Sequence, residues 1–272
     1  MLGALIGDLC GSIYEDSNYK EKPSTLIHPK CHFTDDSVLT SAVSSAFLKY
    51  WSNQQFSRIK YDDKYDNLLV QFVITEILEF TKKYPWAGYG ASFVKWIHSA
   101  QHLPYNSYGN GAAMRTSCCG WAARSQEEAR RYGENIAGIT HNHPDGIKSA
   151  VLISECIYVL KHNGSKRDVF NIASHYYDMD FSIAEIRNTY RFDLRANGSV
   201  PQAIKCFLEG DSFEEILKLS ISLGGDSDTI SAISGSLAEI VYPIPTELIQ
   251  FAIKRIPEDI LYPVFKAEEL WG

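Results

Sequence analysis

The amino-acid sequence predicts an all-α protein, a compact orthogonal array of many helices. Apolar residues recur at spacings of three and four in one segment after another, as in Leu69, Phe72, Val73, Ile77 and Phe80, and this is the pattern of a helix with one buried face. Alternation with a period of two is hard to find over five or more residues. Connections are short, and neither a low-complexity linker nor a solenoid repeat occurs. We therefore expect one domain over residues 1–272.

The expected helices are bounded by recognisable start and stop signals. Ser125 and Ser212 each stand three residues before a glutamate, which predicts a capping box at two helix starts. Pro144 suits the first turn of a helix, and prolines precede the last two helices. In chain order, the predicted helices cover residues 3–15, 38–51, 68–83, 90–100, 125–138, 147–161, 166–177, 183–189, 199–209, 212–224, 230–241, 246–254 and 258–270.

The composition is that of an ordinary globular protein with an acidic balance. A formal net charge of −7 and the lack of a basic stripe argue against general nucleic-acid binding and against an anionic-membrane surface. The N-terminal stretch reaches Asp8 too early for a signal peptide or a membrane span, so we expect a cytoplasmic location. Six cysteines without C-x-x-C or paired-histidine spacing indicate neither a zinc cage nor a disulfide framework. For the oligomeric state we favour a monomer.

One short stretch carries a high density of oxygen ligands at a helix start. Two glycines precede two carboxylates and a hydroxyl, and an apolar helical run follows at once. Hard oxygen ligands and free backbone N–H groups then share one small volume, which suits a cation. Ordinary N-capping and an ordinary glycine turn are the alternative, but capping explains only one of the two acids. The stretch is Gly224-Gly225-Asp226-Ser227-Asp228-Thr229.

A second oxygen-rich cluster stands far upstream. Thr34, Asp35 and Asp36 again place two acids and a hydroxyl where a helix begins. If the two helix starts converge, four carboxylates meet, and burying that many like charges is prohibitive without cations. Oxygen ligands select magnesium, manganese or calcium over zinc or copper. Two such ions about 4 Å apart can bind vicinal hydroxyls and orient or activate a water molecule.

Two other groups of possible ligands fit a metal site less well. Asp62, Asp63 and Asp66 lack the spacing of an EF-hand, so we interpret them as a solvated helix start on the surface. His141 and His143 could ligate a transition metal, but no third nitrogen or sulfur ligand is visible. Polar positioning of a ligand is therefore the favoured role for these histidines.

A rigid, glycine-rich turn covers residues 104–111 and leads into Ala112-Ala113-Met114-Arg115. Loops of this kind, at the entry to a helix, can expose several N–H groups to an anion. Taken alone, such a turn is more often only a turn. Its place in the sequence becomes informative only beside the other motifs.

Together these motifs resemble the ADP-ribosylglycohydrolase family, to which the dinitrogenase-reductase-activating glycohydrolases belong. Five motifs occur in the family's order between residues 3 and 229, which is most of the chain. The acid-rich pair and the Gly-Asn-Gly-x-x-Met-Arg element are specific in combination. The motifs are Gly3-Ala4-Leu5-Ile6-Gly7-Asp8 with Glu15, Thr34-Asp35-Asp36-Ser37, Ser107-Tyr108-Gly109-Asn110-Gly111-Ala112-Ala113-Met114-Arg115, Thr140-His141 and Gly225-Asp226-Ser227-Asp228-Thr229.

This resemblance implies an ADP-ribosylglycohydrolase-like all-α fold with two divalent cations, Mg²⁺ or Mn²⁺. Glu15 matches an acid that lies beside the metals and takes part in catalysis or gating in the serine-directed and O-linked branch. Asp36 and Asp228 complete the implied catalytic set. Asp228 is the best candidate to bridge both ions. The implied metal ligands are Thr34, Asp35, Asp36, Asp226, Asp228 and Thr229. The implied substrate-binding residues are Ser107, Tyr108, Gly109, Asn110, Gly111, Met114 and His141. Two departures stand out, because Ser37 and Ser227 occupy positions where many relatives have threonine.

The predicted activity is therefore metal-dependent hydrolysis of the glycosidic bond between ADP-ribose and an acceptor. The acceptor would be a protein side chain or a small O- or N-linked conjugate, so the expected partner is an ADP-ribosylated protein or an ADP-ribose conjugate. One alternative is a non-catalytic ADP-ribose-binding or structural relative, but clustered acids that repel one another speak against it. Another is a hydrolase of a different ribosyl or nucleotide compound, which would share the site and differ in its pocket walls.

Overall fold

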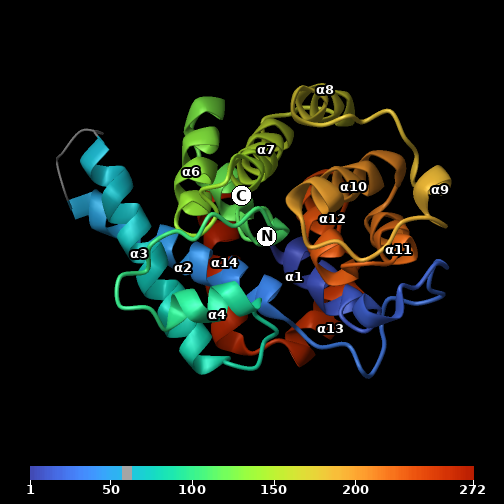
Figure 1. The fold of residues 1–272 in the computed structure, drawn as a ribbon, viewed down its shortest axis with the longest axis horizontal. Coiled ribbons are helices and arrows are strands. Elements are labelled where there is room, and N and C mark those ends of the chain that lie inside the picture. Colours follow the sequence, from blue (N-terminus) through green and yellow to red (C-terminus); the bar gives the residue numbers. More distant parts are fainter. Residues whose placement is uncertain (57–62) are drawn as a thin grey trace.

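The computed structural model describes every residue except 57–62, and every side chain except those of 53–67. Within the described residues the chain forms helices and no strand, and the one β contact is an isolated bridge between Gly109 and Arg195 (Figure 1). The all-α prediction is confirmed. The helices are α1 (Leu2–Gly11), α2 (Asp35–Phe56), α3 (Asp63–Lys83), α4 (Ala91–Ile97), α5 (Ser117–Ala122), α6 (Gln126–Gly138), α7 (Pro144–Lys161), α8 (Lys166–Tyr176), α9 (Ile183–Ile186), α10 (Ala196–Glu209), α11 (Phe213–Leu223), α12 (Ser227–Val241), α13 (Thr246–Arg255) and α14 (Glu258–Trp271), with 3₁₀ turns η1 (Glu15–Ser17) and η2 (Asn110–Ala112).

Each helix expected from the sequence is present, with ends that shift by a few residues. The largest difference at a functional position concerns the first helix. It ends at Gly11, and Glu15 lies in the separate turn η1 instead of on the helix. Helix α5 was not predicted, because its small residues Cys118, Cys119 and Gly120 form no periodic apolar pattern.

Each of the two expected capping boxes forms only one of its two hydrogen bonds. Ser125 accepts a hydrogen bond from the backbone N–H of Glu128, and Ser212 accepts one from that of Glu215. The return bonds are missing, because the Glu128 carboxylate accepts the N–H of Arg124 at 2.8 Å and that of Glu215 pairs with a surface lysine. The second half of each box prediction was therefore wrong.

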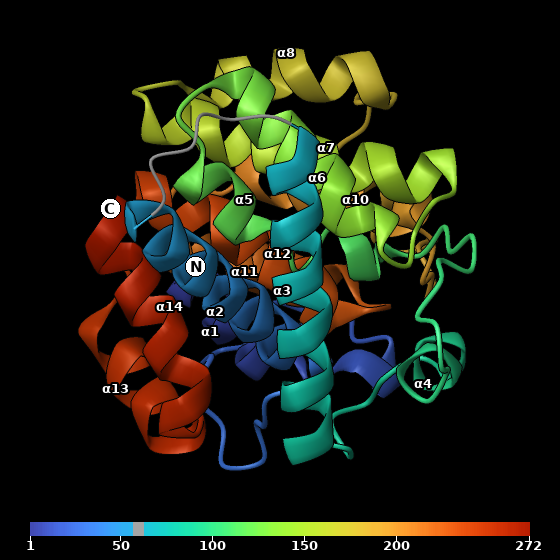
Figure 2. The same ribbon diagram turned by 90° about the vertical axis from the view of Figure 1, so that its left-hand side faces the viewer.

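Buried apolar side chains form one main cluster, which runs from Met1 to Ala267. Helices α1 and α12 lie in its interior, and in both views, Figures 1 and 2, other helices surround them. The single domain remains a prediction that this shared core favours. No helix among the described residues is both long and apolar enough to cross a bilayer. The surface position expected for Asp62, Asp63 and Asp66 concerns side chains outside the described residues.

The two interior helices touch backbone to backbone. Gly3, Gly7 and Gly11 recur every fourth residue along α1 and therefore share one face of the helix. A Cβ atom on Gly7 would lie 2.0 Å from the carbonyl oxygen of Ser231, and one on Gly11 would lie 2.4 Å from that of Ser227. Only glycine permits this approach. The contact brings the residues that follow Gly7 on α1 next to the first turn of α12.

We expect Gly7→Ala to destabilise the protein by about 1–3 kcal/mol or more, because the added methyl group forces α1 away from the Ser231 carbonyl. Urea unfolding followed by circular dichroism would measure the change. Gly138→Ala is the control, since Gly138 is also a helical glycine, the last residue of α6, and a Cβ atom there meets nothing within 4 Å. The control should be neutral or stabilising by up to about 1 kcal/mol. Equal effects at both glycines would contradict the contact.

Candidate active site

Asp8 on α1 holds the first turn of α2. Its carboxylate is fully buried and accepts hydrogen bonds from the backbone N–H groups of Thr34 and Ser37 at 2.9 and 3.0 Å. It also accepts the Thr34 hydroxyl at 2.7 Å and the Ser37 hydroxyl. Asp8 thus caps α2 from another helix and satisfies donors that a helix start leaves free. Asp8 belongs to the first motif but was not among the implied site residues. Its hydrogen bonds fix the turn that carries Asp35 and Asp36.

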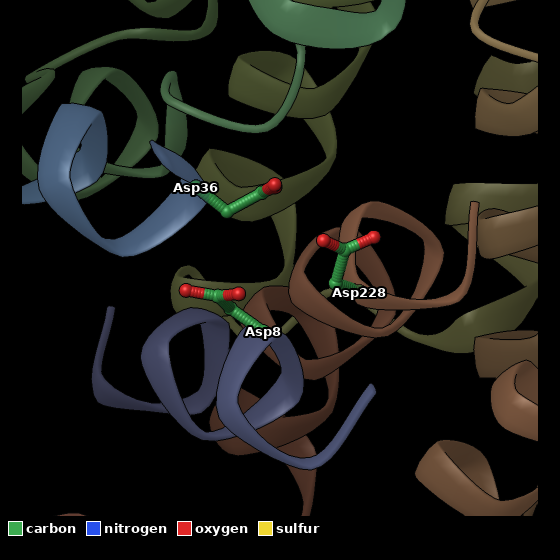
Figure 3. Close-up of side chains that lie close together, drawn as sticks. All are labelled: Asp8, Asp36 and Asp228. Atoms are coloured by element: carbon green, nitrogen blue, oxygen red, sulfur yellow. The ribbon is translucent and has the colours of Figure 1, made fainter. Parts of the chain in front are cut away.

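The acids from the two ends of the chain converge, as expected from the sequence. Oxygen atoms of Asp8, Asp36 and Asp228 lie within 4.8 Å of one another, and Figure 3 shows the three side chains directed into one space from α1, α2 and α12. Oxygen atoms of Glu15, Asp226 and Asp228 form a second group at the same spacing. Asp228 belongs to both groups. Either group could hold a metal ion through oxygen ligands.

Burial and mutual repulsion dominate the electrostatics of these acids. Burial, followed by the charge of Asp228, raises the pKa of Asp36 and of Asp226 well above the ordinary value. The same two causes raise the pKa of Asp8 to about 6 and that of Glu15 to about 7. A nearby positive charge would stabilise the ionised form of these four carboxylates and lower their pKa. No lysine or arginine is among the main causes of their pKa shifts.

Hydrogen bonds hold some of the carboxylate oxygens and leave others free. The Thr229 hydroxyl donates to Asp36 Oδ2 at 3.0 Å, and the Asn110 amide donates to Asp226 Oδ2 at 2.5 Å. Asp36 Oδ1 is buried and has no hydrogen-bond partner. A buried carboxylate oxygen without a donor is costly, and a cation bound there would remove that cost. The donor set therefore fits hard divalent cations.

The residues to which the resemblance assigned a catalytic, metal-binding or substrate-binding role line one cleft of about 720 Å³. The implied metal ligands and Glu15 lie on its walls, although Asp35 belongs to neither oxygen group described above. Ser107 to Gly111, Met114 and His141 line the same cleft. The roles assigned to these residues remain predictions, since the placement alone does not show what each one does. The exposed side chains of Trp86 and Phe192 at the cleft were not anticipated, because nothing in a sequence marks an aromatic residue as exposed.

The glycine-rich loop offers fewer N–H donors to the cleft than the sequence suggested. The N–H of Ser107 donates to the Thr140 carbonyl at 3.4 Å, and that of Gly109 donates to the Ser107 hydroxyl at 3.3 Å. The N–H of Asn110 donates to the Leu194 carbonyl at 2.9 Å. The expectation of several free N–H groups was therefore wrong for these three residues. Fewer of the loop's N–H groups are therefore free to bind an anion than its sequence suggested.

The two neighbouring histidines have different surroundings. His141 is only 4% exposed, and burial and the charge of Arg115 hold its pKa well below the ordinary value. His143 caps α7 by accepting the N–H of Asp145 at 3.1 Å, and its ring lies 5.6 Å from that of Tyr108. The described side chains contain no group of three potential metal ligands that includes a histidine. His141 lines the cleft and is placed to position a ligand, whereas His143 caps α7 and does not line the cleft.

Comparison with known proteins connects this cleft to an activity. The sequence model of the ADP-ribosylglycohydrolase family matches residues 1–250 of the chain. The chain belongs to the ADP-ribosylglycohydrolase family. It is therefore a hydrolase that acts on glycosyl bonds. The family resemblance inferred from the sequence motifs is confirmed. Membership in this family implies that its substrates are ADP-ribose conjugates.

Curated relatives of this ADP-ribosylglycohydrolase include ADP-ribosylhydrolase ARH3 of Homo sapiens and of Danio rerio. Each is 24% identical to the chain; the alignments cover 89% and 90% of this chain and 84% and 82% of the relative. A solved structure described as an ADP-ribosylglycohydrolase-related protein complex superposes with a TM-score of 0.65 at 18% identity. The superposition covers 98% of this chain and 91% of the other. It confirms the fold expected from the resemblance.

The buried His141 makes a testable contribution to the pH dependence of stability. The unfolded chain protonates His141 below about pH 6.5, whereas the folded protein keeps it neutral. Stability from this residue is therefore present above that pH and lost as the pH falls. The unfolding free energy of the wild type should fall relative to that of His141→Gln by about 1.4 kcal/mol per pH unit below pH 6. Urea unfolding at several pH values would measure it.

The control for this experiment is His98→Gln, because the His98 side chain is exposed. Its unfolding free energy should keep a constant difference from the wild type over the same pH range. A constant difference for His141→Gln as well would show that the folded protein protonates His141 as readily as the unfolded chain does.

Proposed function

We propose that this protein is a metal-dependent hydrolase that releases ADP-ribose from an acceptor and so reverses ADP-ribosylation. The observation that carries the proposal is that Asp228, which lines the cleft, belongs to both clusters of carboxylate oxygens. A cleft of about 720 Å³ suits a ligand of nucleotide size. The names of the relatives, ADP-ribosylhydrolases, support the same activity.

The acids at the base of the cleft form the proposed metal centre. Two Mg²⁺ or Mn²⁺ ions bound there would supply Lewis-acid stabilisation of ribose hydroxyls and an activated water. Asp228, which belongs to both oxygen groups, is the proposed bridge. The proposed ligands are Thr34, Asp35, Asp36, Asp226, Asp228 and Thr229.

Glu15 is the proposed acid and base. It lies half-buried in turn η1, beside Asp226 and Asp228, and its carboxyl group lines the cleft. The bond to break joins C1″ of the distal ribose to the acceptor, through a transition state with oxocarbenium character. The Glu15 carboxyl would give a proton to the departing acceptor atom and later take one from water. Asp228 and Asp36 would take part by holding the cations that fix the hydroxyls of the distal ribose.

The opposite wall of the cleft would hold the rest of the ADP-ribose moiety. Asn110 connects this wall to the acids, because its side-chain amide donates to Asp226. A shift of the loop would therefore also move a proposed metal ligand. Ser107 to Gly111, Met114 and His141 would position the pyrophosphate and the proximal ribose, and the exposed ring of Tyr108 is available for stacking.

Release of ADP-ribose from serine-linked, arginine-linked, O-acyl and nucleic-acid-linked conjugates tests the activity directly. With Mg²⁺ or Mn²⁺ present, the wild type should cleave at least one linkage, as measured by chromatography. Asp228→Asn should lower kcat by about 10²-fold or more, because it removes a charge from the centre of both groups. Its helical circular dichroism should be unchanged. The exposed Asp211→Asn is the control and should retain full activity. No release from any conjugate would contradict the proposal.

Metal removal tests the centre separately from the chemistry. In calorimetry, free ADP-ribose should bind the Mg²⁺-loaded protein and bind the chelated protein at least about tenfold more weakly, because the ribose hydroxyls lose their cations. Glu15→Gln should bind ADP-ribose in the loaded state but hydrolyse conjugates slowly. Equal affinity with and without metal would instead support a binding protein that needs no metal centre.

A further inference from the structure

Behind the glycine-rich loop, three buried residues form a short chain of hydrogen bonds. The guanidinium of Arg115, 1% exposed, donates from Nη2 to the Thr140 hydroxyl at 2.7 Å and to the Ile136 carbonyl at 3.2 Å. The Thr140 hydroxyl is fully buried and lies 2.6 Å from Nδ1 of His141. No metal ligand takes part in this chain.

The direction of these bonds follows from what each group can donate. A guanidinium only donates, so the Thr140 oxygen accepts from Arg115. Among the hydrogen bonds of the Thr140 hydroxyl, the one neighbour that can accept its proton is Nδ1 of His141. A proton on Nδ1 would leave that hydroxyl proton buried without an acceptor, which is costly. The arrangement therefore selects a neutral imidazole with its proton on Nε2.

The other nitrogen of the ring faces the loop. A Cβ atom on Gly109 would lie 3.7 Å from Nε2 of His141, and one on Gly111 would lie 3.6 Å from it. In the same loop, the N–H groups of Ser107, Gly109 and Asn110 already donate hydrogen bonds to acceptors within the protein. An N–H group on Nε2 of His141 would add a donor beside a loop whose own N–H groups are partly occupied.

We propose that Arg115 and Thr140 are positioning residues that hold His141 as an Nε2–H donor, aimed at an anionic oxygen of the ligand in the cleft. The identity of that ligand, the pyrophosphate of an ADP-ribose conjugate, rests on the proposed function. The tautomer does not, because it follows from bonds present without any ligand. Thr140 also fixes the distance between ring and loop, since its carbonyl accepts the N–H groups of Tyr105 and Ser107 at 3.3 and 3.4 Å.

The tautomer is measured by long-range ¹H–¹⁵N correlation NMR of the imidazoles in the ligand-free wild type. The His141 signals are assigned by their loss in His141→Gln. We expect the pattern of an Nε2-protonated ring. Thr140→Val removes the hydroxyl at nearly constant volume and should give a mixture of tautomers or the Nδ1-protonated form. Thr140→Ser keeps the hydroxyl and should restore the wild-type pattern. An Nδ1-protonated ring in the wild type, or an unchanged pattern in Thr140→Val, would overturn the assignment.

The role toward the ligand has its own readout. Calorimetry with ADP-ribose in the presence of Mg²⁺ should show about tenfold weaker binding for Thr140→Val than for Thr140→Ser, the scale of one lost hydrogen bond to a charged group. With a cleaved conjugate, KM should rise more than kcat falls. Equal affinities in the two variants would overturn the positioning role. If the wild type itself fails to bind ADP-ribose, the proposed function fails with the ligand role, whereas the tautomer result stands.

Discussion

The rest of the structure depends on the backbone contact between α1 and α12. Glycines at every fourth position of α1 let its backbone meet the carbonyls of Ser227 and Ser231 without intervening side chains. The residues next to these contact points are acids, Asp8 after Gly7 and Asp228 after Ser227. The closest approach of two helices therefore also sets the spacing of carboxylates in the site. A looser packing of the same helices would leave the acids too far apart to share a cation.

Bringing these acids together opposes folding, and the chain compensates only in part. The bonds from Thr34 and Ser37 satisfy Asp8, while Thr229 and Asn110 each hold one oxygen of another carboxylate. The remaining repulsion supports the proposed cation site, because a buried group of like charges is stabilised by a counter-charge. Proteins commonly accept such local conflict where function requires it.

Much of the fold could be predicted from the sequence because amphipathic helices are local. Each expected helix exists, and the two acid clusters, whose convergence the sequence left open, do meet. Helix α5 could not be found, since a run of small buried residues has no apolar face to detect. The two departures from the family pattern also become clear. Ser37 keeps its bonds to Asp8, and Ser227 donates to the carbonyl of Gly11 at 3.0 Å, so serine suffices at both positions.

The missed parts of the site are those that depend on long-range geometry. The four-residue spacing of Gly3, Gly7 and Gly11 was visible in the sequence, but its partner on α12 was not. Asp8 appeared to be an ordinary acid on a helix because its partners lie more than twenty residues away. The loop around Gly109 suggested free N–H donors, which only the tertiary structure shows to be occupied. Local sequence patterns thus identified the candidate site residues, whereas their hydrogen-bond partners depend on the tertiary structure.

The separation of the two acid clusters along the chain also bears on biosynthesis. Thr229 and Asp36, which share a hydrogen bond, are 193 positions apart. A nascent chain that has emerged only as far as α11 carries Thr34, Asp35 and Asp36 but neither Asp226 nor Asp228. Contacts between such distant segments form late and slowly. The acids of the cleft can therefore come together only after α12 has been synthesised, and until then Asp36 lacks its partner Thr229.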